Sequence, residues 1–114
     1  MKLPLRPKPY WIESHTPKEF GQLEGDLEVD TVVIGGGIAG LTTAYQLTQA
    51  GQTVALLEKD RVGIGVTGHT TGKVTSQHSL IYEKFASRFG DETARTYGSA
   101  NEAAVVHIET IINR

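Results

Sequence analysis

The sequence predicts an α/β fold in which a strand, a glycine turn, a helix and a second, parallel strand follow one another. Three observations support this prediction. A short apolar run at 32–34 leads into three consecutive glycines, and a segment of helical period follows and ends at Gly51. A second apolar run, 54–57, then ends in Glu58. Residues 30–58 therefore predict a Rossmann-like βαβ unit, the smallest piece of a doubly wound sheet that binds a dinucleotide.

Each glycine of the expected GxGxxG turn has a physical reason. Gly35 lets the chain turn out of the first strand, Gly37 lets a pyrophosphate approach the backbone, and Gly40 lets the helix pack closely on the sheet. The amides of Ile38 and Ala39 are expected at the helix N-terminus, where unpaired N–H groups and the helix dipole favour an anion. The turn predicts a dinucleotide site; the alternative is a crossover with a glycine turn and no ligand.

Glu58 follows Gly37 by 21 residues, at the end of the second predicted strand. A carboxylate at this point accepts hydrogen bonds from a ribose diol and repels a 2′-phosphate. Glu58 therefore disfavours NADP and is compatible with FAD and with NAD. The alternative is an exposed acid at the end of a strand.

The helix between the two strands has an apolar face and an expected stop. Ile38, Leu41, Ala44 and Leu47 recur at helical spacing and are expected to face the sheet. Gly51 stands where a glycine commonly ends a helix.

Composition sets limits on the function. The 114 residues are enough for one small domain, and 11 basic against 13 acidic residues leave a net charge of −2, which gives no indication of nucleic acid as a partner. The chain has no cysteine, which fits a reducing compartment, and we expect a cytoplasmic protein without a metal site. Residues 31–57 carry no charge, but eight Thr or Gln residues interrupt them, so we expect no membrane span.

Residues 1–29 are predicted to be an N-terminal arm and linker. All four prolines lie here, which disfavours regular structure early in the chain. Tyr10 and Trp11 are expected to bury their rings against a neighbouring surface; a place near a substrate entrance is the alternative. The run from Glu19 to Asp30 has five acidic groups and no basic one, which predicts a solvated linker.

The segment after Glu58 predicts a loop that faces the cofactor. Residues 59–73 contain four glycines and three threonines, which disfavour a stable helix. Their amides and hydroxyls are suited to phosphate or ribityl oxygens, and the long flavin half of FAD needs such donors beyond the first turn. The loop therefore favours FAD over NAD, with a flexible surface loop as the alternative. The candidate contacts are Lys59, Thr67, Gly68, His69, Thr70 and Thr71.

Two helices are predicted beyond this loop. Residues 73–77 suggest a short strand, and a helix is expected over 79–89, with Ile81, Phe85 and Phe89 on its apolar face and Gly90 as its stop. Asp91 is expected to cap a longer helix that runs to about residue 113. Its expected buried face consists of Ala94, Tyr97, Ala104, Ile108 and Ile111.

The chain also resembles a known family. GGGIAGLTTAYQLTQAGQTVALLEKD followed by GIGVTGHTTGKVTSQH is similar to the N-terminus of FAD-dependent oxidoreductases of the D-amino-acid oxidase and glycine oxidase family. The preceding YW and LEGDLEVD resemble the lead-in of members with a C-terminal Rieske iron–sulfur domain. The resemblance implies FAD as cofactor and oxidation of a C–N bond of an amine or amino acid, with oxygen or another acceptor receiving the electrons.

The resemblance also implies roles for particular residues. Gly35, Gly37, Gly40 and Glu58 would hold the ADP half of FAD, and 67–71 would lie near the pyrophosphate and the flavin. Family members often have Ser or Ala where this chain has His69, Thr70 and Thr71. A few related dehydrogenases attach FAD covalently to a histidine in a similarly placed loop. For His69, a covalent link, a non-covalent contact and a solvent-facing side chain remain open.

The resemblance places other parts of the enzyme outside this chain. We expect residues 30–114 to be the N-terminal segment of a larger FAD-binding domain, because the apolar surface of the last helix exceeds what these residues can cover. The substrate domain, the catalytic residues and any Rieske cluster are expected elsewhere. Two other functions remain open, an NAD-binding domain of a dehydrogenase and a non-catalytic protein that binds a partner.

Overall fold

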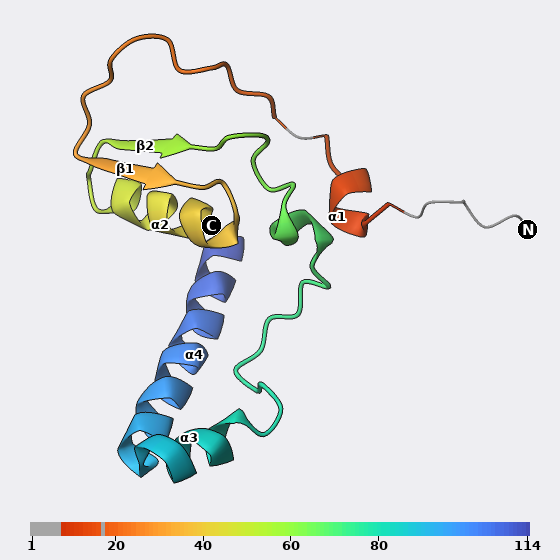
Figure 1. The fold of residues 1–114 in the computed structure, drawn as a ribbon, viewed down its shortest axis with the longest axis vertical. Helices are drawn as coiled ribbons and strands as arrows, with labels where there is room; N and C mark the ends of the chain where they lie inside the picture. The colour runs from red at the N-terminus through yellow and green to blue at the C-terminus, as the bar shows by residue number, and fades with distance from the viewer. Residues whose placement is uncertain (1–7, 17) are drawn as a thin grey trace, which may run out of the picture. The chain divides into compact units, whose positions relative to one another are not determined.

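The computed structural model describes residues 8–16 and 18–114 (Figure 1). The chain divides into two compact units, with the boundary between Thr71 and Gly72. All of the candidate cofactor-binding residues belong to the first unit. Each unit is therefore described on its own.

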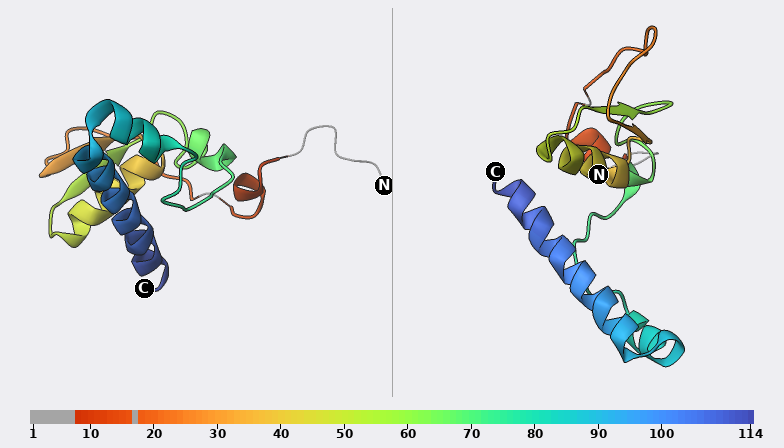
Figure 2. Two further views of the ribbon diagram at one scale, coloured as in Figure 1. Left: turned by 90° about the horizontal axis from the view of Figure 1, so that it is seen from below. Right: turned by 90° about the vertical axis from the view of Figure 1, so that its left-hand side faces the viewer.

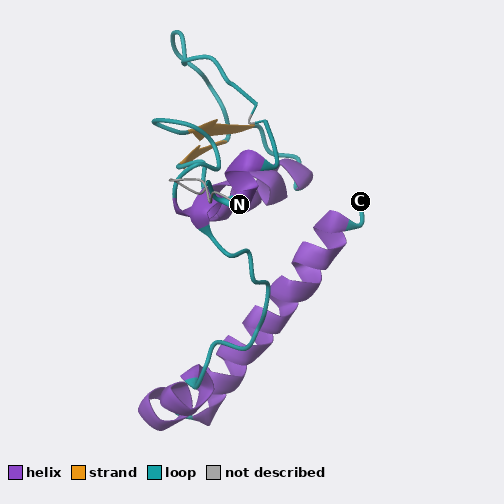
Figure 3. Ribbon diagram, turned by 90° about the vertical axis from the view of Figure 1, so that its right-hand side faces the viewer, coloured by secondary structure: helices purple, strands orange, loops and turns teal. Residues whose placement is uncertain are grey.

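The first unit contains a small parallel sheet and one long helix. Strands β1 (Thr31–Ile34) and β2 (Val54–Leu57) pair in parallel, and helix α2 (Ile38–Gln49) connects them. The register joins Thr31 to Val54 at one end and Ile34 to Leu57 at the other. Helix α2 lies along one face of the two strands in Figures 1 and 3. The predicted strand, helix and second strand thus all form, in a mixed α/β unit.

Helix α2 ends where the sequence predicts. Gly51 has a φ of +87°, a conformation that favours glycine. Its N–H donates to the carbonyl of Thr48 at 3.0 Å, and the N–H of Gln52 donates to the carbonyl of Leu47 at 3.1 Å. These two bonds form a Schellman motif, which satisfies carbonyls at the end of the helix.

The sheet-facing side of α2 differs in part from the prediction. Ala44 and Leu47 are half-buried as expected, whereas Ile38 and Leu41 are 63% and 39% exposed. The packed face instead begins at Gly40, where an added Cβ would lie 3.4 Å from Cγ1 of Val33. Residues 40, 44 and 47 share one helix face. The expectation for Ile38 and Leu41 was wrong because the close approach at Gly40 decides which face meets the strand.

Burial alternates along β1. Val33 and its register partner Leu56 are half-buried, and Val33 is the strand residue that approaches Gly40 of α2; Ala55, the register partner of Val32, is 9% exposed. On the first strand Val32 and Ile34 are exposed, the latter at 87%. One face of the sheet is thus packed against α2, whereas large apolar side chains of the other face remain accessible.

The N-terminal arm contains a short helix that was not expected. Helix α1 (Tyr10–Glu13) follows Pro9, which has a φ of −59°. Proline disfavours a helix interior, but its fixed φ suits a helix start, so the prediction of no regular structure was wrong here. Tyr10 is 71% exposed and is not an anchor, whereas Trp11 is about half exposed. The acidic stretch that follows is exposed, as expected of a linker, and Glu19 pairs with Arg61 at 3.1 Å.

The second unit is a pair of helices, α3 (Ile81–Phe89) and α4 (Asp91–Ile112). Figure 2 shows α3 folded back beside the first turns of α4. Gly90 joins the helices with a φ of +88°. Phe85 stacks on Tyr97 with 4.6 Å between the ring centroids. The two predicted helices are confirmed, with α3 starting two residues later than expected.

Four details of the second unit differ from the prediction. Residues 73–77, all of them described, form no strand, and a local bond from the N–H of Gln77 to Oγ1 of Thr75 turns the chain instead. Gly90 rather than Asp91 caps α4, without a side-chain hydrogen bond. Phe89 is 54% exposed, and Ala104 is exposed on a face that was expected to be buried. The other residues predicted for that face, Ala94, Tyr97, Ile108 and Ile111, are half-buried.

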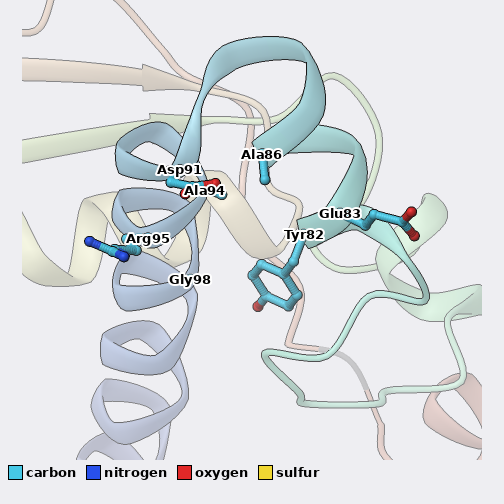
Figure 4. Close-up of a pocket in the computed structure, with 7 residues that line it drawn as sticks. All are labelled: Tyr82, Glu83, Ala86, Asp91, Ala94, Arg95 and Gly98. Carbon is cyan, nitrogen blue, oxygen red and sulfur yellow. The ribbon is translucent and has the colours of Figure 1, made fainter.

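A shallow hollow lies in the angle between α3 and α4 (Figure 4). An added Cβ at Gly98 would lie 3.2 Å from the Tyr82 ring, so the glycine allows the ring to pack on α4. The hollow is lined by Tyr82, Glu83, Ala86, Asp91, Ala94, Arg95 and Gly98. Among the residues that the structure describes, no helix is long and apolar enough to cross a bilayer.

Candidate cofactor site

The turn between β1 and α2 leaves no space for a side chain at Gly40. Gly35 has a φ of +105°, and its N–H continues the sheet by donating to the carbonyl of Leu57 at 2.7 Å. A Cβ on Gly40 would overlap the carbonyl oxygen of Gly35. The predicted reasons for Gly35 and Gly40, a sharp turn and a close approach, are therefore both visible in the backbone.

The N-terminus of α2 meets a hydroxyl from the distant loop. The N–H of Ile38 donates to Oγ1 of Thr67 at 2.9 Å. An added Cβ at Gly37 would lie 3.3 Å from the same oxygen. The Thr67 hydroxyl accepts this bond and keeps its own hydrogen to donate. A helix N-terminus that carries a hydroxyl able to donate is suited to an anion.

Glu58 is held by backbone amides on both carboxylate oxygens. The N–H of Gly36 donates to Oε2 at 2.7 Å, and the N–H of Asp60 donates to Oε1 at 3.1 Å. These bonds, chiefly the one from Gly36, lower the pKa of Glu58, and the charge of Lys59 adds to the effect. The carboxylate therefore stays ionised at neutral pH. Each oxygen retains capacity to accept a further bond, such as one from a ribose hydroxyl.

Gly36 is a site residue that the sequence analysis did not single out. It is buried, and its carbonyl accepts a bond from the N–H of Gly63 at 2.9 Å. An added Cβ would lie 3.1 Å from Cβ of Glu58 and 3.1 Å from Cγ2 of Val62. Gly36 thus ties the turn to Glu58 and to the following loop. The signal in the sequence was the third glycine in an unbroken run.

The loop after β2 contains a turn of 3₁₀ helix, η1 (Val66–His69). Gly68 within it is buried, and a Cβ there would lie 2.7 Å from the carbonyl oxygen of Gly63. Nδ1 of His69 lies 3.1 Å from the carbonyl oxygen of Ile64 and 2.9 Å from that of Gly65. Carbonyl oxygens only accept, so Nδ1 carries a hydrogen and donates it to them.

The remaining candidate residues lie at the surface of the same unit. Trp11 donates its indole N–H to the carbonyl oxygen of Thr70 at 2.9 Å, a contact that the sequence analysis did not foresee. The structure thus joins Thr67 to the α2 N-terminus and Glu58 to the glycine turn. Four further candidates are exposed: Ala39, Lys59, Thr70 and Thr71. Within residues 8–16 and 18–114, no three His, Asp or Glu side chains gather as metal ligands.

Comparison with known proteins decides the family. The family described as FAD dependent oxidoreductase matches residues 30–110, which include the glycine turn, Glu58 and η1. The chain belongs to this family. FAD is therefore the cofactor, and the resemblance drawn from the glycine turn and the following loop is confirmed.

Individual relatives are similar over much of the chain. The Bacillus subtilis protein YhfW, which bears the name of a Rieske 2Fe-2S iron-sulfur protein, is 46% identical over 94% of this chain and 21% of its own length. Gamma-glutamylputrescine oxidoreductase of Escherichia coli is 35% identical over 70% of this chain and 19% of its own. Mitochondrial dimethylglycine dehydrogenase of Rattus norvegicus is 38% identical over 60% and 9%.

The chain spans about a fifth of the length of the first two of these relatives. No solved structure matches it. The glycine turn, the α2 N-terminus and the Glu58 carboxylate fit a dinucleotide, because a Cβ at Gly40 has no room, one at Gly36 would press on Glu58, and the polar atoms are amides, a hydroxyl and an oriented carboxylate.

Proposed function

We propose that β1, α2 and β2 form a Rossmann-like dinucleotide-binding unit that holds the ADP half of FAD. The observation that best supports this is the Gly36 amide bond to Glu58, 2.7 Å long, which orients a carboxylate beside the same turn that begins α2. An exposed acid at a strand end would need no such partner. Two amides of the backbone instead fix both of its oxygens.

In this proposal the residues bind and orient the cofactor. Glu58 accepts hydrogen bonds from the adenosine ribose, and the amide of Ala39 faces the pyrophosphate, whereas the amide of Ile38 acts through the Thr67 hydroxyl to which it donates. The Thr67 hydroxyl, which already accepts from Ile38, donates its hydrogen to a phosphate oxygen. Gly37 leaves the approach open.

The reaction that we propose is oxidation of a carbon–nitrogen bond in an amine or amino acid. FAD, when bound, accepts a hydride from the carbon next to the nitrogen. The names of two relatives, gamma-glutamylputrescine oxidoreductase and dimethylglycine dehydrogenase, both refer to amines. Since these proteins are similar to this chain in the cofactor-binding segment, they support the substrate class and not one particular substrate.

We further propose that a Rieske iron–sulfur centre, rather than oxygen alone, receives the electrons. The support is the name of YhfW together with its similarity over 94% of this chain, which includes the N-terminal arm. Slow reoxidation by oxygen and fast reoxidation in the presence of the iron–sulfur partner are the expected results.

Anaerobic mixing of the intact flavoprotein with a panel of amines tests the substrate class. Primary, secondary and tertiary amines and amino acids are compared with the alcohol analogues of the same carbon chains. We expect at least one amine, and none of the alcohols, to bleach the oxidised flavin absorbance. Bleaching by alcohols alone, or by NADH alone, would contradict the proposed reaction.

A further inference from the structure

The N-terminal helix contacts the loop that faces the cofactor at two points. The indole N–H of Trp11 donates to the carbonyl oxygen of Thr70, directly after η1. The next residue, Ile12, packs on η1, since a Cβ at Gly68 would lie 3.1 Å from its Cγ1 and 3.2 Å from its Cδ1. Figure 1 shows α1 beside this turn. Both contacts come from the N-terminal arm, which was predicted from its prolines.

A third contact joins the arm to the start of the same loop. Glu19 pairs with Arg61 at 3.1 Å, two residues before Gly63. This pair is exposed and contributes little by itself. The position of the pair is more important than its strength. It lies two residues before Gly63, whose N–H donates to the carbonyl of Gly36 in the glycine turn. The arm therefore contacts the loop near its start, at Arg61, and again within and just after η1, at Gly68 and Thr70.

The position of the Thr67 hydroxyl depends on this loop. Thr67 lies inside η1, between the Gly63 anchor and the Thr70 carbonyl that Trp11 binds. Its bond to the N–H of Ile38 spans 29 residues of sequence. A glycine-rich segment has many alternative backbone conformations, so contacts at both of its ends reduce the entropy that is lost when Thr67 is fixed.

We propose that α1 is a positioning element for the cofactor, with Trp11 and Ile12 holding η1 so that Thr67 stays at the N-terminus of α2. This inference rests on the proposed cofactor role of the glycine turn and of Thr67. Trp11 is a positioning residue, since it acts through Thr70 and η1. The arm thereby belongs functionally to the FAD site.

Trp11→Phe in the intact protein tests the inference, because it removes the indole N–H and keeps an aromatic ring. We expect the dissociation constant of FAD to rise about 3- to 10-fold, which is the effect of losing one neutral hydrogen bond. The visible circular dichroism of the bound flavin, recorded at saturating FAD, should also change. The matched control is Phe20→Leu, which alters another exposed aromatic of the arm.

Two parallel measurements separate the possible outcomes. The urea midpoint of the flavin-stripped protein is measured for wild type and Trp11→Phe; a lower midpoint with unchanged FAD affinity and unchanged flavin dichroism would mean a purely structural role and would overturn the inference. Glu58→Gln is titrated alongside. If Glu58→Gln weakens FAD binding and Trp11→Phe does not, only the positioning role of α1 is wrong. If neither does, the proposed cofactor site is wrong as well.

Discussion

Two segments meet at the N-terminus of α2, and they are shaped in different ways. The glycine turn, 35–40, has its geometry set within six residues, since Gly35 adopts a positive φ and Gly40 lies against the Gly35 carbonyl. The loop that contains η1 is held from outside itself, by Ile38, by Gly36 and by Trp11. We conclude that the turn does not tolerate a side chain at Gly40, whereas the loop responds by degrees when single contacts are removed.

The largest expected effect is at the least tolerant point of the turn. Gly40→Ala places a Cβ on the carbonyl oxygen of Gly35, so the helix must move away from the strand. We expect the free energy of unfolding to fall by about 1–3 kcal/mol, the range for overpacking. Urea denaturation of the intact protein measures it. Gly21→Ala, where a Cβ meets nothing within 4 Å, is the control and should change stability by less than about 0.5 kcal/mol.

The next effect concerns the carboxylate that the turn orients. Glu58→Gln keeps the shape of the side chain but removes its charge, and an NH2 group, which only donates, replaces one of the two accepting carboxylate oxygens. We expect FAD affinity to fall about 10- to 100-fold, as for a lost charged hydrogen bond. Fluorescence of released flavin after dilution of the holoprotein gives the dissociation constant. Glu24→Gln, in the exposed linker, serves as the matched control, and an equal loss in both variants would count against the role of Glu58.

Some residues of the candidate site can be predicted from the sequence, and others cannot. Gly35, Gly37, Gly40, Gly51 and Glu58 act through local backbone geometry and strand ends, so spacing alone predicts them. The bond of Thr67 to Ile38 and that of Trp11 to Thr70 join residues 29 and 59 positions apart. The spacing of residues along the sequence does not predict contacts between segments so far apart.

The errors of the prediction also come from contacts that the spacing of residues in the sequence does not show. Residues 73–77 show the composition of a short strand, but a strand needs a partner, and in this unit the segment turns through Thr75 instead. Ile38 and Leu41 have helical spacing, yet the glycine contact rotates another face of α2 onto the sheet. Gly36 was missed because its importance comes from contacts with Glu58 and Val62 rather than from the motif.

A smaller effect is expected in acid. The folded protein lowers the pKa of Glu58 through the Gly36 amide and that of Asp30 through the hydroxyl and amide of Thr53. A carboxyl group whose pKa is lowered on folding contributes its full stabilisation above its ordinary pKa of about 4. This contribution disappears as the pH falls through the lowered pKa of the folded state. Urea midpoints of wild type and Glu58→Gln should therefore differ at pH 7 and converge in acid. A constant difference would contradict the amide–carboxylate contact.

The state of His69 can be resolved without any variant. Its Nδ1 lies within hydrogen-bond distance of two carbonyl oxygens, so Nε2 is the ring nitrogen that is left for a non-covalent contact with the cofactor. We expect acid precipitation of the holoprotein to release the flavin into the supernatant. Flavin that stays with the precipitate, and disappears from it in His69→Asn, would establish a covalent link instead.

The most direct test of the cofactor site is the FAD affinity of Gly37→Val. An added side chain at this position points toward the Thr67 hydroxyl and fills the approach to the α2 amides, where the pyrophosphate is proposed to bind. Flavin fluorescence of the intact protein should show a loss of affinity greater than that of Glu58→Gln, while Gly21→Val, in open space, binds FAD as the wild type does. Unchanged FAD affinity in Gly37→Val would show that this turn does not hold the cofactor.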